Sequence, residues 1–462
     1  MIHLVLLSGG SGTRLWPLSN NARSKQFLKV LRDERGEHVS MVQRTFAQIA
    51  RVPAELDVTV ATCETQRQSL EAQVEGPYAL VLEPERRDTA PAIMLACAHL
   101  AWEQGADDGD TVVAMPIDTY ADQDYFDRVP LLDAAVQAGA AELVLLGVEP
   151  TYPSEKYGYV VPASRAPLAA GGAGALPVER FTEKPGAAQA AALIERGALW
   201  NCGVFAFRLG HVRAIAARYV DAAGYAELLG RYAELPRISF DYEVVERASS
   251  VAVIPYAGAW KDLGTWNTLA EEMAEPYSGR AVVDEATCSN VRVVNETGLP
   301  LVVAGLSDAV VVATHDGVLV SSLEASSGIK GAVARAAESR PMYERRRWGE
   351  YRVLDMRAYA GGARQLTKEL VVEPGRQLSY QRHLHRAEVW TVVAGEGEAV
   401  LDGEVVALSP GSVVSVQPRR LHAVRALGGE LHIIEVQLGD TLAEEDIERF
   451  GNFWDAEGRP RE

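Results

Sequence analysis

Cysteines are few in this chain, and their spacing pairs none of them. Cys63, Cys97, Cys202 and Cys288 are its four cysteines, and they lie far apart in the sequence. They therefore lack the close spacing typical of zinc sites and redox motifs. We expect reduced thiols, which fits a cytoplasmic protein better than a secreted one.

An excess of positive charge is also missing. The 45 Lys and Arg residues face 63 Asp and Glu residues, which gives a formal net charge of -18. Binding to a nucleic-acid backbone needs a basic face, so we expect no nucleic-acid partner. A small anionic substrate would have to be met by Lys and Arg residues gathered at one place.

Long apolar runs are absent as well. The apolar run at residues 2–7 is followed at once by glycines and an arginine, which is too short and wrongly flanked for a signal peptide. No stretch approaches the length of a membrane-spanning helix. We therefore expect a buried strand at the start of the chain, no membrane partner and a cytoplasmic location.

Two common nucleotide-binding motifs cannot be found. The Gly-Lys-Ser/Thr of a P-loop is missing, and Gly9, Gly10 and Gly12 do not follow the G-x-G-x-x-G spacing. A dinucleotide-dependent oxidoreductase is therefore disfavoured.

The patterns that are present predict three domains. Up to residue 275, apolar runs such as IHLVLL and DTVVAMP alternate with helical patterns, which predicts a doubly wound α/β domain with ligands at the carboxyl ends of its strands. Residues 276–340 read as a β-rich connector with a short helix. Strands separated by glycines and prolines at 341–462 suit a small β-barrel. Residues 167–176 are predicted to form a surface loop.

A glycine-rich turn, SGGSGTR, follows the first predicted strand. Glycines permit positive φ angles and let backbone N–H groups approach phosphate oxygens, and Arg14 adds a fixed cation. Taken alone, the turn is equally consistent with an ordinary tight turn.

The longer run SGGSGTRLWPLSNNARSKQFLKVL resembles the signature of mannose-1-phosphate guanylyltransferases and related sugar nucleotidyltransferases. The resemblance continues in order through EPERRDTAPAI, AMPIDTYADQDYF, EKYGYVV, RFTEKP, WNCGVFAFR, SFDYEVVE and WKDLGTWNTL. It implies a Rossmann-like nucleotidyltransferase fold. The implied reaction is the transfer of GMP from GTP to mannose-1-phosphate, which gives GDP-mannose and pyrophosphate.

The resemblance also implies roles for individual residues. Arg14 and Lys25 match positions that bind the triphosphate and stabilise the leaving pyrophosphate, and Asp118 and Asp262 match the metal-binding aspartates. Two carboxylates suit Mg²⁺, which prefers hard oxygen ligands. The expected nucleotide-binding residues are Ser8, Gly9, Gly10, Gly12, Thr13, Arg14, Lys25 and Asp88.

On the sugar side, the resemblance assigns Gly158, Glu183, Lys184, Asn201 and Gly203. Glu183 and Asn201 would accept sugar hydroxyls, Lys184 would pair with the sugar phosphate, and Gly158 would let the backbone approach the sugar. Without the resemblance, the Glu-Lys pair would read as a solvated strand end and Asn201 as a turn residue.

The sequence departs from the family pattern at three places. Ser24 stands where proline is usual before the signature lysine, Asp88 stands where asparagine is usual, and Ile-Asp-Thr replaces Ala-Asp-His around Asp118. These changes leave the reaction class intact but leave open another NTP or another sugar-1-phosphate with a non-catalytic C-terminal barrel. A non-catalytic sugar-nucleotide-binding scaffold is a further alternative.

The C-terminal segment EPGRQLSYQRHLHRAEVWTVVAGEGEAV resembles the first cupin motif. Residues two apart in a strand face the same side, so His383 and His385 would both point into the barrel. Together with Glu388 and His422, they would hold a divalent transition metal such as Zn²⁺. Histidines kept only for packing or solvent contact are the alternative.

The whole barrel resembles the type II phosphomannose isomerase half of bifunctional enzymes. It would add mannose-6-phosphate isomerase activity, although Val389 replaces the histidine usual after the glutamate and PRRLH lacks the usual Pro-x-Gly turn. A cupin can also serve as an oligomerisation module, so the sequence leaves a homo-oligomer open.

Overall fold

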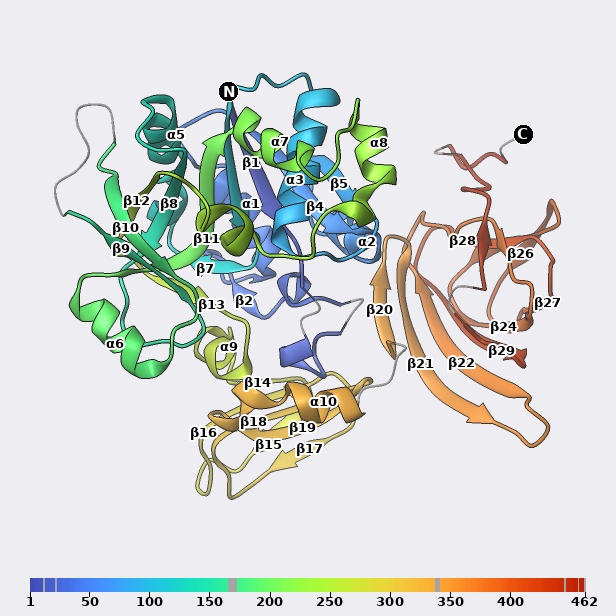
Figure 1. The fold of residues 1–462 in the computed structure, drawn as a ribbon. Coiled ribbons are helices and arrows are strands. Elements are labelled where there is room, and N and C mark those ends of the chain that lie inside the picture. Colours follow the sequence, from blue (N-terminus) through green and yellow to red (C-terminus); the bar gives the residue numbers. More distant parts are fainter. Residues whose placement is uncertain are drawn as a thin grey trace. The chain divides into compact units, whose positions relative to one another are not determined.

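The computed structural model describes residues 1–10, 13–20, 23–164, 173–336, 341–443, 446–455 and 457–460. The chain forms two compact units (Figure 1), which are Met1–Leu15 with Ser24–Pro276, and Trp16–Arg23 with Tyr277–Glu462. Most of the loop predicted at 167–176 lies outside the described residues. Within the described ranges, no helix is long and apolar enough to cross a membrane.

A nine-stranded sheet forms the centre of the N-terminal unit, in the order β5-β4-β1-β6-β11-β8-β12-β10-β9. The strands are β1 (Ile2–Leu7), β4 (Leu56–Cys63), β5 (Ala79–Glu83), β6 (Thr111–Pro116), β8 (Leu143–Val148), β9 (Gly158–Pro162), β10 (Leu176–Thr182), β11 (Leu199–Arg208) and β12 (Val251–Tyr256).

Strand β1 runs parallel to both of its neighbours, β4 and β6. The chain moves outward from β1 to β4 and β5 and then returns to the other side of β1 at β6, so the strand order reverses there. Such a reversal opens a crevice at the carboxyl ends of the strands, where ligands bind. The doubly wound α/β prediction is confirmed, with β11 inserted antiparallel between β6 and β8.

Helices cover both faces of this sheet, because successive side chains of a strand point to opposite sides. Leu4 and Leu6 of β1 join one hydrophobic cluster, and Val5 joins the other. The helices are α1 (Met41–Ile49), α2 (Glu64–Glu71), α3 (Thr89–Trp102), α4 (Gln123–Phe126), α5 (Val129–Gln137), α6 (Ala187–Glu195), α7 (Leu209–Ala217), α8 (Tyr225–Gly230) and α9 (Trp266–Glu272). Residues of α1 and α5 pack into the first cluster, and residues of α3 and α7 into the second.

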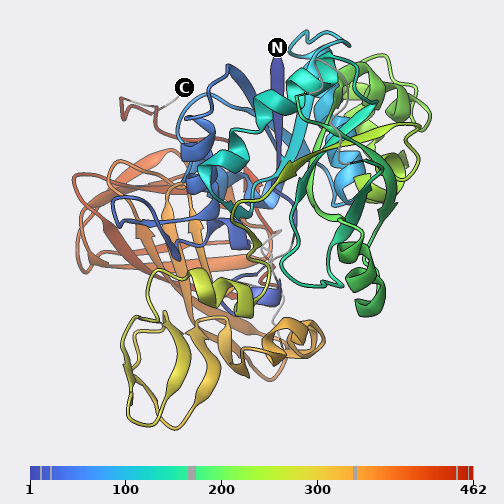
Figure 2. The same cartoon turned by 90° about the vertical axis from the view of Figure 1, so that its left-hand side faces the viewer.

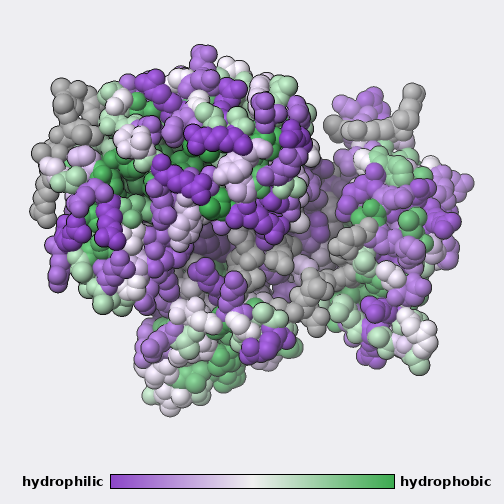
Figure 3. Space-filling model, in the orientation of Figure 1, coloured by the Kyte–Doolittle hydropathy of each residue, from purple (hydrophilic) through white to green (hydrophobic). Residues whose placement is uncertain are grey.

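The β-rich connector is a short stack of parallel strand pairs, drawn in yellow to orange in Figure 2. It contains β14 (Tyr277–Ser278), β15 (Ala281–Val283), β16 (Ser289–Asn295), β17 (Leu301–Val303), β18 (Ser307–Thr314) and β19 (Gly317–Ser322). Strand β16 pairs in parallel with β14 and β18, and β15 with β17, so successive turns of chain stack on a valine-rich core. Figure 3 shows apolar side chains gathered over this segment. Val282 and Val302, which belong to it, are exposed. The predicted short helix follows as α10 (Lys330–Ala336).

Two antiparallel sheets form the C-terminal barrel, as predicted, in the orders β20-β21-β22-β29-β24-β27 and β26-β25-β28-β23-β30. Trp390, Val372 and Ile433 lie in the hydrophobic cluster inside it. The strands are β20 (Tyr343–Arg346), β21 (Gly349–Ala358), β22 (Arg364–Val372), β23 (Gln381–Arg382), β24 (Arg386–Ala394), β25 (Gly397–Leu401), β26 (Glu404–Leu408), β27 (Val413–Val416), β28 (His422–Ala426), β29 (Leu431–Gly439) and β30 (Glu448–Arg449).

Candidate active site

Pairing between two short strands brings the two predicted metal-binding aspartates together. Strand β7 (Thr119–Ala121) runs antiparallel to β13 (Trp260–Asp262), and Asp262 lies opposite Thr119. Asp118 directly precedes β7, just after the carboxyl end of β6. Gly264 leaves room for the second carboxylate, since a Cβ at that position would lie 2.9 Å from Asp262 Oδ1.

The ammonium group of Lys25 joins these two carboxylates. Its Nζ lies 2.8 Å from Asp118 Oδ2 and 2.9 Å from Asp262 Oδ1. Burial acts to lower the pKa of Lys25, but the charges of the two aspartates outweigh it and raise the pKa. Burial acts to raise the pKa of Asp262, but the charges of Lys25 and then Arg14 outweigh it and lower the pKa. Lys25 and Asp262 are therefore both charged at neutral pH.

The glycine-rich turn begins where β1 ends. Ser8 is buried, Gly9 and Gly10 are exposed, and Gly10 has a φ of 112°, a conformation that favours glycine. A Cβ on either glycine would meet nothing within 4 Å, so the backbone here is open to a ligand. Gly12 lies outside the described residues, and Thr13 is described only as backbone at the start of the 3₁₀ helix Thr13–Leu15. Arg14 lies in the same helix and is exposed.

Buried polar side chains tie this turn to the segment that carries Lys25. Gln66 Nε2 donates to Ser24 Oγ at 2.7 Å, and Ser24 Oγ donates to the carbonyl oxygen of Gly10 at 3.4 Å. Gln26 Nε2 donates to Ser8 Oγ at 3.0 Å. Ser24 stands where the family usually has proline, and its hydroxyl makes two contacts that a proline could not make.

A cavity of about 250 Å³ runs from Lys25 to the predicted sugar residues. It is lined by Lys25, Pro116, Asp118, Thr119, Lys156, Tyr157, Gly158, Glu183, Asn201, Cys202, Gly203, Asp241, Trp260 and Asp262. The structure thus brings the predicted catalytic lysine, both predicted metal-binding aspartates and four of the five predicted sugar-binding residues around one space.

Glu183 is one of the residues that line this cavity. Its side chain is 8% exposed, and Oε2 is buried with no hydrogen-bond partner among the described residues. That oxygen occupies the space that a Cβ on Gly158 would need, so Gly158 is what admits the carboxylate. Asn201 is held by two bonds: Nδ2 donates to Asp241 Oδ1 at 2.5 Å, and Oδ1 accepts from Gly203 N at 3.1 Å.

Sequence reasoning did not assign Asp241, although it lies within the matched segment SFDYEVVE. It begins the short helix η4 (Asp241–Val245), beside Asn201. Burial and then the charge of Glu183 raise the pKa of Asp241 to about 6. Lys156, Tyr157 and Trp260 were missed as well, and the rings of Tyr157 and Trp260 meet edge to face with centroids 5.2 Å apart. Only an acidic residue inside a matched motif pointed to Asp241.

Lys184 and Asp88 are not among the described residues that line the cavity. Lys184 is 58% exposed on its side chain and pairs with Glu183 Oε1 at 2.6 Å. Asp88 caps the N-terminus of α3, where its Oδ1 accepts from Thr89 N at 2.8 Å. It follows the carboxyl end of β5, on the same edge of the sheet as the glycine-rich turn.

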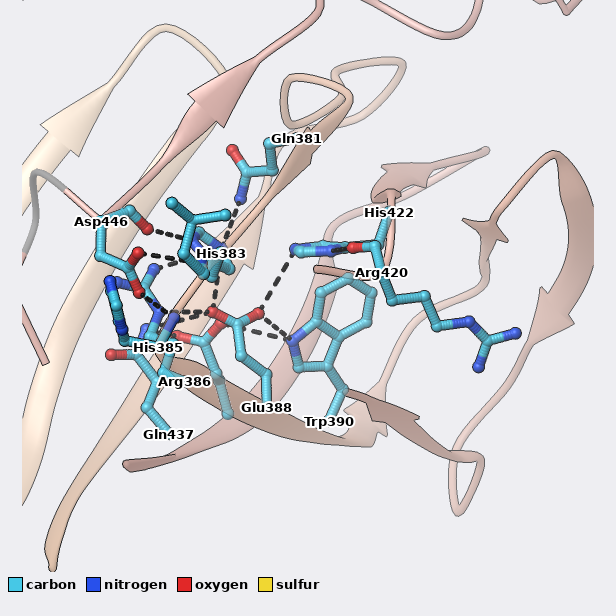
Figure 4. Close-up of polar contacts among 12 residues, drawn as sticks. Gln381, His383, His385, Arg386, Glu388, Trp390, Arg420, His422, Gln437 and Asp446 are labelled. Carbon is cyan, nitrogen blue, oxygen red and sulfur yellow. Dashed lines mark hydrogen bonds and ion pairs between the residues drawn. The ribbon is translucent and has the colours of Figure 1, made fainter. Parts of the chain in front are cut away.

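A second cluster lies inside the C-terminal barrel (Figure 4). His383, Glu388 and His422 are buried, and one potential ligand atom from each lies within 4.8 Å of the others. His383 Nδ1 donates to the carbonyl oxygen of Asp446 at 2.6 Å, and His422 Nδ1 donates to that of Arg420 at 2.8 Å. Since a carbonyl oxygen only accepts, both imidazoles keep their Nε2 lone pairs for the interior, as metal-binding histidines do.

The Nε2 atoms of the two imidazoles differ in their contacts. His422 Nε2 has no hydrogen-bond partner among the described residues and lies 3.6 Å from Glu388 Oε2. Burial lowers the pKa of His383 to about 4 and also lowers that of His422. Both are therefore neutral at physiological pH, which is the state that can bind a metal ion.

The prediction that His385 also points into the barrel is wrong. His385 is exposed, because residues 383–385 form a turn between β23 and β24 rather than a strand. Asp446 holds that turn: its carboxylate accepts from Leu384 N at 2.9 Å and from His385 N at 3.0 Å.

Arg386 takes the interior position instead, and sequence reasoning missed it. Its Nε donates to Glu388 Oε1 at 3.0 Å, and its Nη2 donates to His383 Nε2 at 3.2 Å. A guanidinium thus occupies the lone pair of one of the two interior imidazoles.

Comparison with known proteins finds two family models that match this chain. Residues 3–277 match the family model described as nucleotidyl transferase, and residues 335–452 match the model described as mannose-6-phosphate isomerase C-terminal. The xanthan biosynthesis protein XanB of Xanthomonas campestris pv. campestris (strain B100) is 34% identical, over 96% of this chain and 97% of that protein. The mannose-1-phosphate guanylyltransferase of Escherichia coli (strain K12) is 32% identical, over 98% of both.

A solved structure has a similar fold. The crystal structure of mannose-1-phosphate geranyltransferase from Thermus thermophilus aligns with a TM-score of 0.56 and 29% identity, over 72% of this chain and 98% of that chain. The chain belongs to the nucleotidyl transferase family, and its C-terminal part carries a mannose-6-phosphate isomerase C-terminal domain.

Proposed function

We propose that the N-terminal unit transfers GMP from GTP to mannose-1-phosphate, giving GDP-mannose and pyrophosphate. One observation carries the proposal: a single cavity is lined by Lys25, Asp118 and Asp262 together with Glu183 and Asn201. The first set suits a magnesium triphosphate, and the second suits a sugar. The full-length relative named mannose-1-phosphate guanylyltransferase supports this choice of substrates.

The chemistry needs charge neutralisation more than a base. A phosphate monoester has a second pKa of ~6, so the attacking oxygen of the sugar phosphate is already ionised at neutral pH. Asp118 and Asp262 would hold Mg²⁺, since converging carboxylates are the hard ligands it prefers, and the bound ion offsets charge on the phosphates. Lys25 and Arg14 supply the protein's own cations to the triphosphate, and the amides of Gly9 and Gly10 are open to its oxygens.

The sugar is held by acceptors of fixed direction. The free Oε2 of Glu183 accepts one hydroxyl in a space that only glycine at 158 leaves open. Asn201 is oriented by Asp241 and Gly203, so its amide cannot turn freely. We propose Asp241 as a third sugar contact and Lys184, beside Glu183, as the partner of the sugar phosphate.

The decisive experiment measures pyrophosphate release from GTP, ATP, CTP and UTP, each with mannose-1-phosphate and glucose-1-phosphate. The proposal predicts GTP with mannose-1-phosphate as the best pair. Asp118→Ala should remove the activity, and Asp221→Asn, an exposed aspartate of the same unit, should leave it unchanged. If no pair releases pyrophosphate, the result would favour a binding scaffold. If Asp118→Ala still turns over the substrates, the proposed role of Asp118 would be refuted.

We further propose that the barrel, residues 341–462, interconverts mannose-6-phosphate and fructose-6-phosphate with a bound divalent metal. The unpartnered Nε2 of His422, the lone pair of His383 and the carboxylate of Glu388 form a donor set that fits Zn²⁺ or a similar ion. Such an ion polarises a substrate oxygen. Arg386 opposes it, because its guanidinium contacts His383 Nε2 and must give way.

Metal analysis and a coupled isomerase assay on the whole chain test this second activity. Bound metal and turnover of mannose-6-phosphate are the expected results, both lost in His422→Ala. A metal-free, inactive protein would instead make the barrel a structural module. With residues 1–275 as the transferase, 276–340 as connector and 341–462 as cupin, we propose a cytoplasmic enzyme of two activities.

A further inference from the structure

The chain leaves the N-terminal unit between two of its proposed catalytic residues. Arg14 belongs to the N-terminal unit, residues Trp16–Arg23 belong to the C-terminal unit, and Ser24 and Lys25 belong to the N-terminal unit again. The segment Trp16–Arg23 is here called the tethered segment. Its described residues pack with residues of the C-terminal unit, which are far away in sequence. Arg14 lies just before this segment, and Lys25 lies just after it.

Arg23 holds the tethered segment by an ion pair with Glu296. Its Nη1 donates to Glu296 Oε2 at 2.6 Å, and its Nη2 donates to Glu296 Oε1 at 2.9 Å. This bidentate geometry fixes the plane of the guanidinium as well as its position. The guanidinium carbon also lies 5.5 Å from the centre of the Tyr343 ring.

A second anchor lies three residues earlier. Asn20 Nδ2 donates to Asp316 Oδ2 at 3.0 Å. Asn20 is itself bound to Arg23, since its Oδ1 accepts from Arg23 N at 2.7 Å and its N donates to Arg23 O at 2.9 Å. The anchors at Glu296 and Asp316 therefore act on two residues that are hydrogen-bonded to each other.

The start of the tethered segment is held as well. Thr314 Oγ1 donates to the carbonyl oxygen of Pro17 at 3.1 Å. Gly317 has a φ of 147°, and a Cβ there would lie 2.5 Å from the ring of Trp16, so glycine is needed for this close approach. Strands β16 and β18 of the connector thus end, and strand β19 begins, next to described residues of the tethered segment.

We propose that Glu296 and Asp316 are positioning residues for nucleotidyl transfer, acting through Arg23 and Asn20 on the backbone that presents Lys25. This inference rests on the proposed function. An isolated surface ion pair contributes little, but this one is bidentate, is 23% and 32% exposed on its two side chains, and is joined to a second anchor. Because the transferring phosphate must meet Arg14 and Lys25 together, small displacements of the segment between them are costly.

The test compares Glu296→Gln and Asp316→Asn with a matched control. Glu398 accepts from Arg425 Nε at 2.9 Å and Nη2 at 2.6 Å, in a pair of similar exposure within the same unit but remote from the tethered segment. Glu398→Gln therefore removes an equivalent ion pair without touching that segment. Each protein is assayed for pyrophosphate release from GTP and mannose-1-phosphate, and its melting temperature is measured.

We expect Glu296→Gln to lower kcat/KM for GTP roughly tenfold or more, with the melting temperature shifted no further than in Glu398→Gln. The reciprocal exchange Arg23→Glu with Glu296→Arg should recover most of the loss, which a purely structural role elsewhere would not predict. Asp316→Asn should act in the same direction as Glu296→Gln.

Hydrogen exchange of peptides covering residues 13–28 provides a readout that does not need turnover. Glu296→Gln should speed amide exchange there, and Glu398→Gln should not. The inference is overturned if Glu296→Gln matches the control in exchange, or matches it in kcat/KM while the wild type is active. A wild type inactive with every substrate pair would instead defeat the proposed function, and exchange would still decide the positioning claim.

Discussion

Lys25 stands between Asp118 and Asp262, where a divalent cation is also expected to bind. Its ammonium lies 2.8 Å from Asp118 Oδ2 and 2.9 Å from Asp262 Oδ1. In the proposed function, Asp118 and Asp262 would hold Mg²⁺, and Lys25 would pair with the triphosphate.

Asp262→Asn tests the electrostatic role of this cluster. The change keeps the shape of the side chain but removes one charge facing the metal and Lys25, so kcat for pyrophosphate release should fall roughly 100- to 1000-fold. Steady-state kinetics at saturating magnesium measures this. Asp221→Asn serves as the control, and a loss of less than about threefold would contradict the assignment of Asp262.

The raised pKa of Asp241 makes the stability of the folded protein depend on pH. Its pKa is raised from 3.8 to about 6, chiefly by burial and then by the charge of Glu183. A raised pKa means that the folded protein holds the proton more tightly than the unfolded chain does. The stabilisation is complete below the ordinary value and is lost as pH rises through the folded value.

We therefore expect the free energy of unfolding of the wild type, relative to Asp241→Asn, to fall as pH rises from about 4 to about 6, and then to level off. Urea unfolding of both proteins across this range measures the difference. A difference that stays flat, or that grows with pH, would show that the carboxyl group of Asp241 is not shifted upward.

At the scale of elements, local pattern predicted more of the transferase site than of the barrel site. The motifs singled out Asp118 and Asp262, each of which follows or ends a short strand, and the β7–β13 pairing brings the two together. In the barrel, the fate of His385 depends on Asp446, which holds the turn from a distant part of the sequence. Strand alternation could not reveal that contact, and so the sequence could not show that Arg386 replaces His385 in the interior.

Strand β9 begins at Gly158, which offers a test of the sugar end. Gly158→Ala places a Cβ where Glu183 Oε2 lies, so KM for mannose-1-phosphate should rise roughly tenfold or more while KM for GTP changes little. Gly109→Ala is the matched control, because its Cβ would meet nothing within 4 Å. Equal KM values in the two variants would remove Glu183 and Gly158 from the proposed sugar site.

Arg386, the first residue of β24, allows a test of how the barrel responds to metal. Arg386→Met removes the cation that contacts His383 Nε2 and Glu388 Oε1, so affinity for a divalent ion should increase. Zinc at about 100 times its Kd would stabilise the protein by about 2.7 kcal/mol, and the zinc-dependent rise in melting temperature should be larger in Arg386→Met than in the wild type. An identical or smaller rise would show that Arg386 does not compete with the metal.

At the scale of the whole molecule, the acidic net charge of -18 contrasts with substrates that are themselves anionic. The positive groups proposed to meet them, Arg14, Lys25 and Lys184, come from separate parts of the chain. The net charge therefore predicts that the chain does not bind nucleic acid. The proposed substrate site depends instead on these cations lying close together in the fold.

The order of the domains could be predicted from the sequence because the alternation of strand and helix patterns is local. Two features of the fold could not be predicted in this way. Strand β11 lies antiparallel between β6 and β8, and the tethered segment packs with the C-terminal unit. Both depend on contacts between residues far apart in sequence, such as Arg23 with Glu296, which no periodicity reveals.

The central claim is that Lys25, Asp118 and Asp262 support nucleotidyl transfer onto a sugar phosphate bound between Glu183 and Asn201. Following the α-phosphorus of labelled GTP in the presence of mannose-1-phosphate and magnesium tests it most directly. The label should appear in GDP-mannose with one pyrophosphate released per product, and Asp118→Ala should form none. Label that never leaves GTP with the wild type, or equal product from Asp118→Ala, would contradict the account.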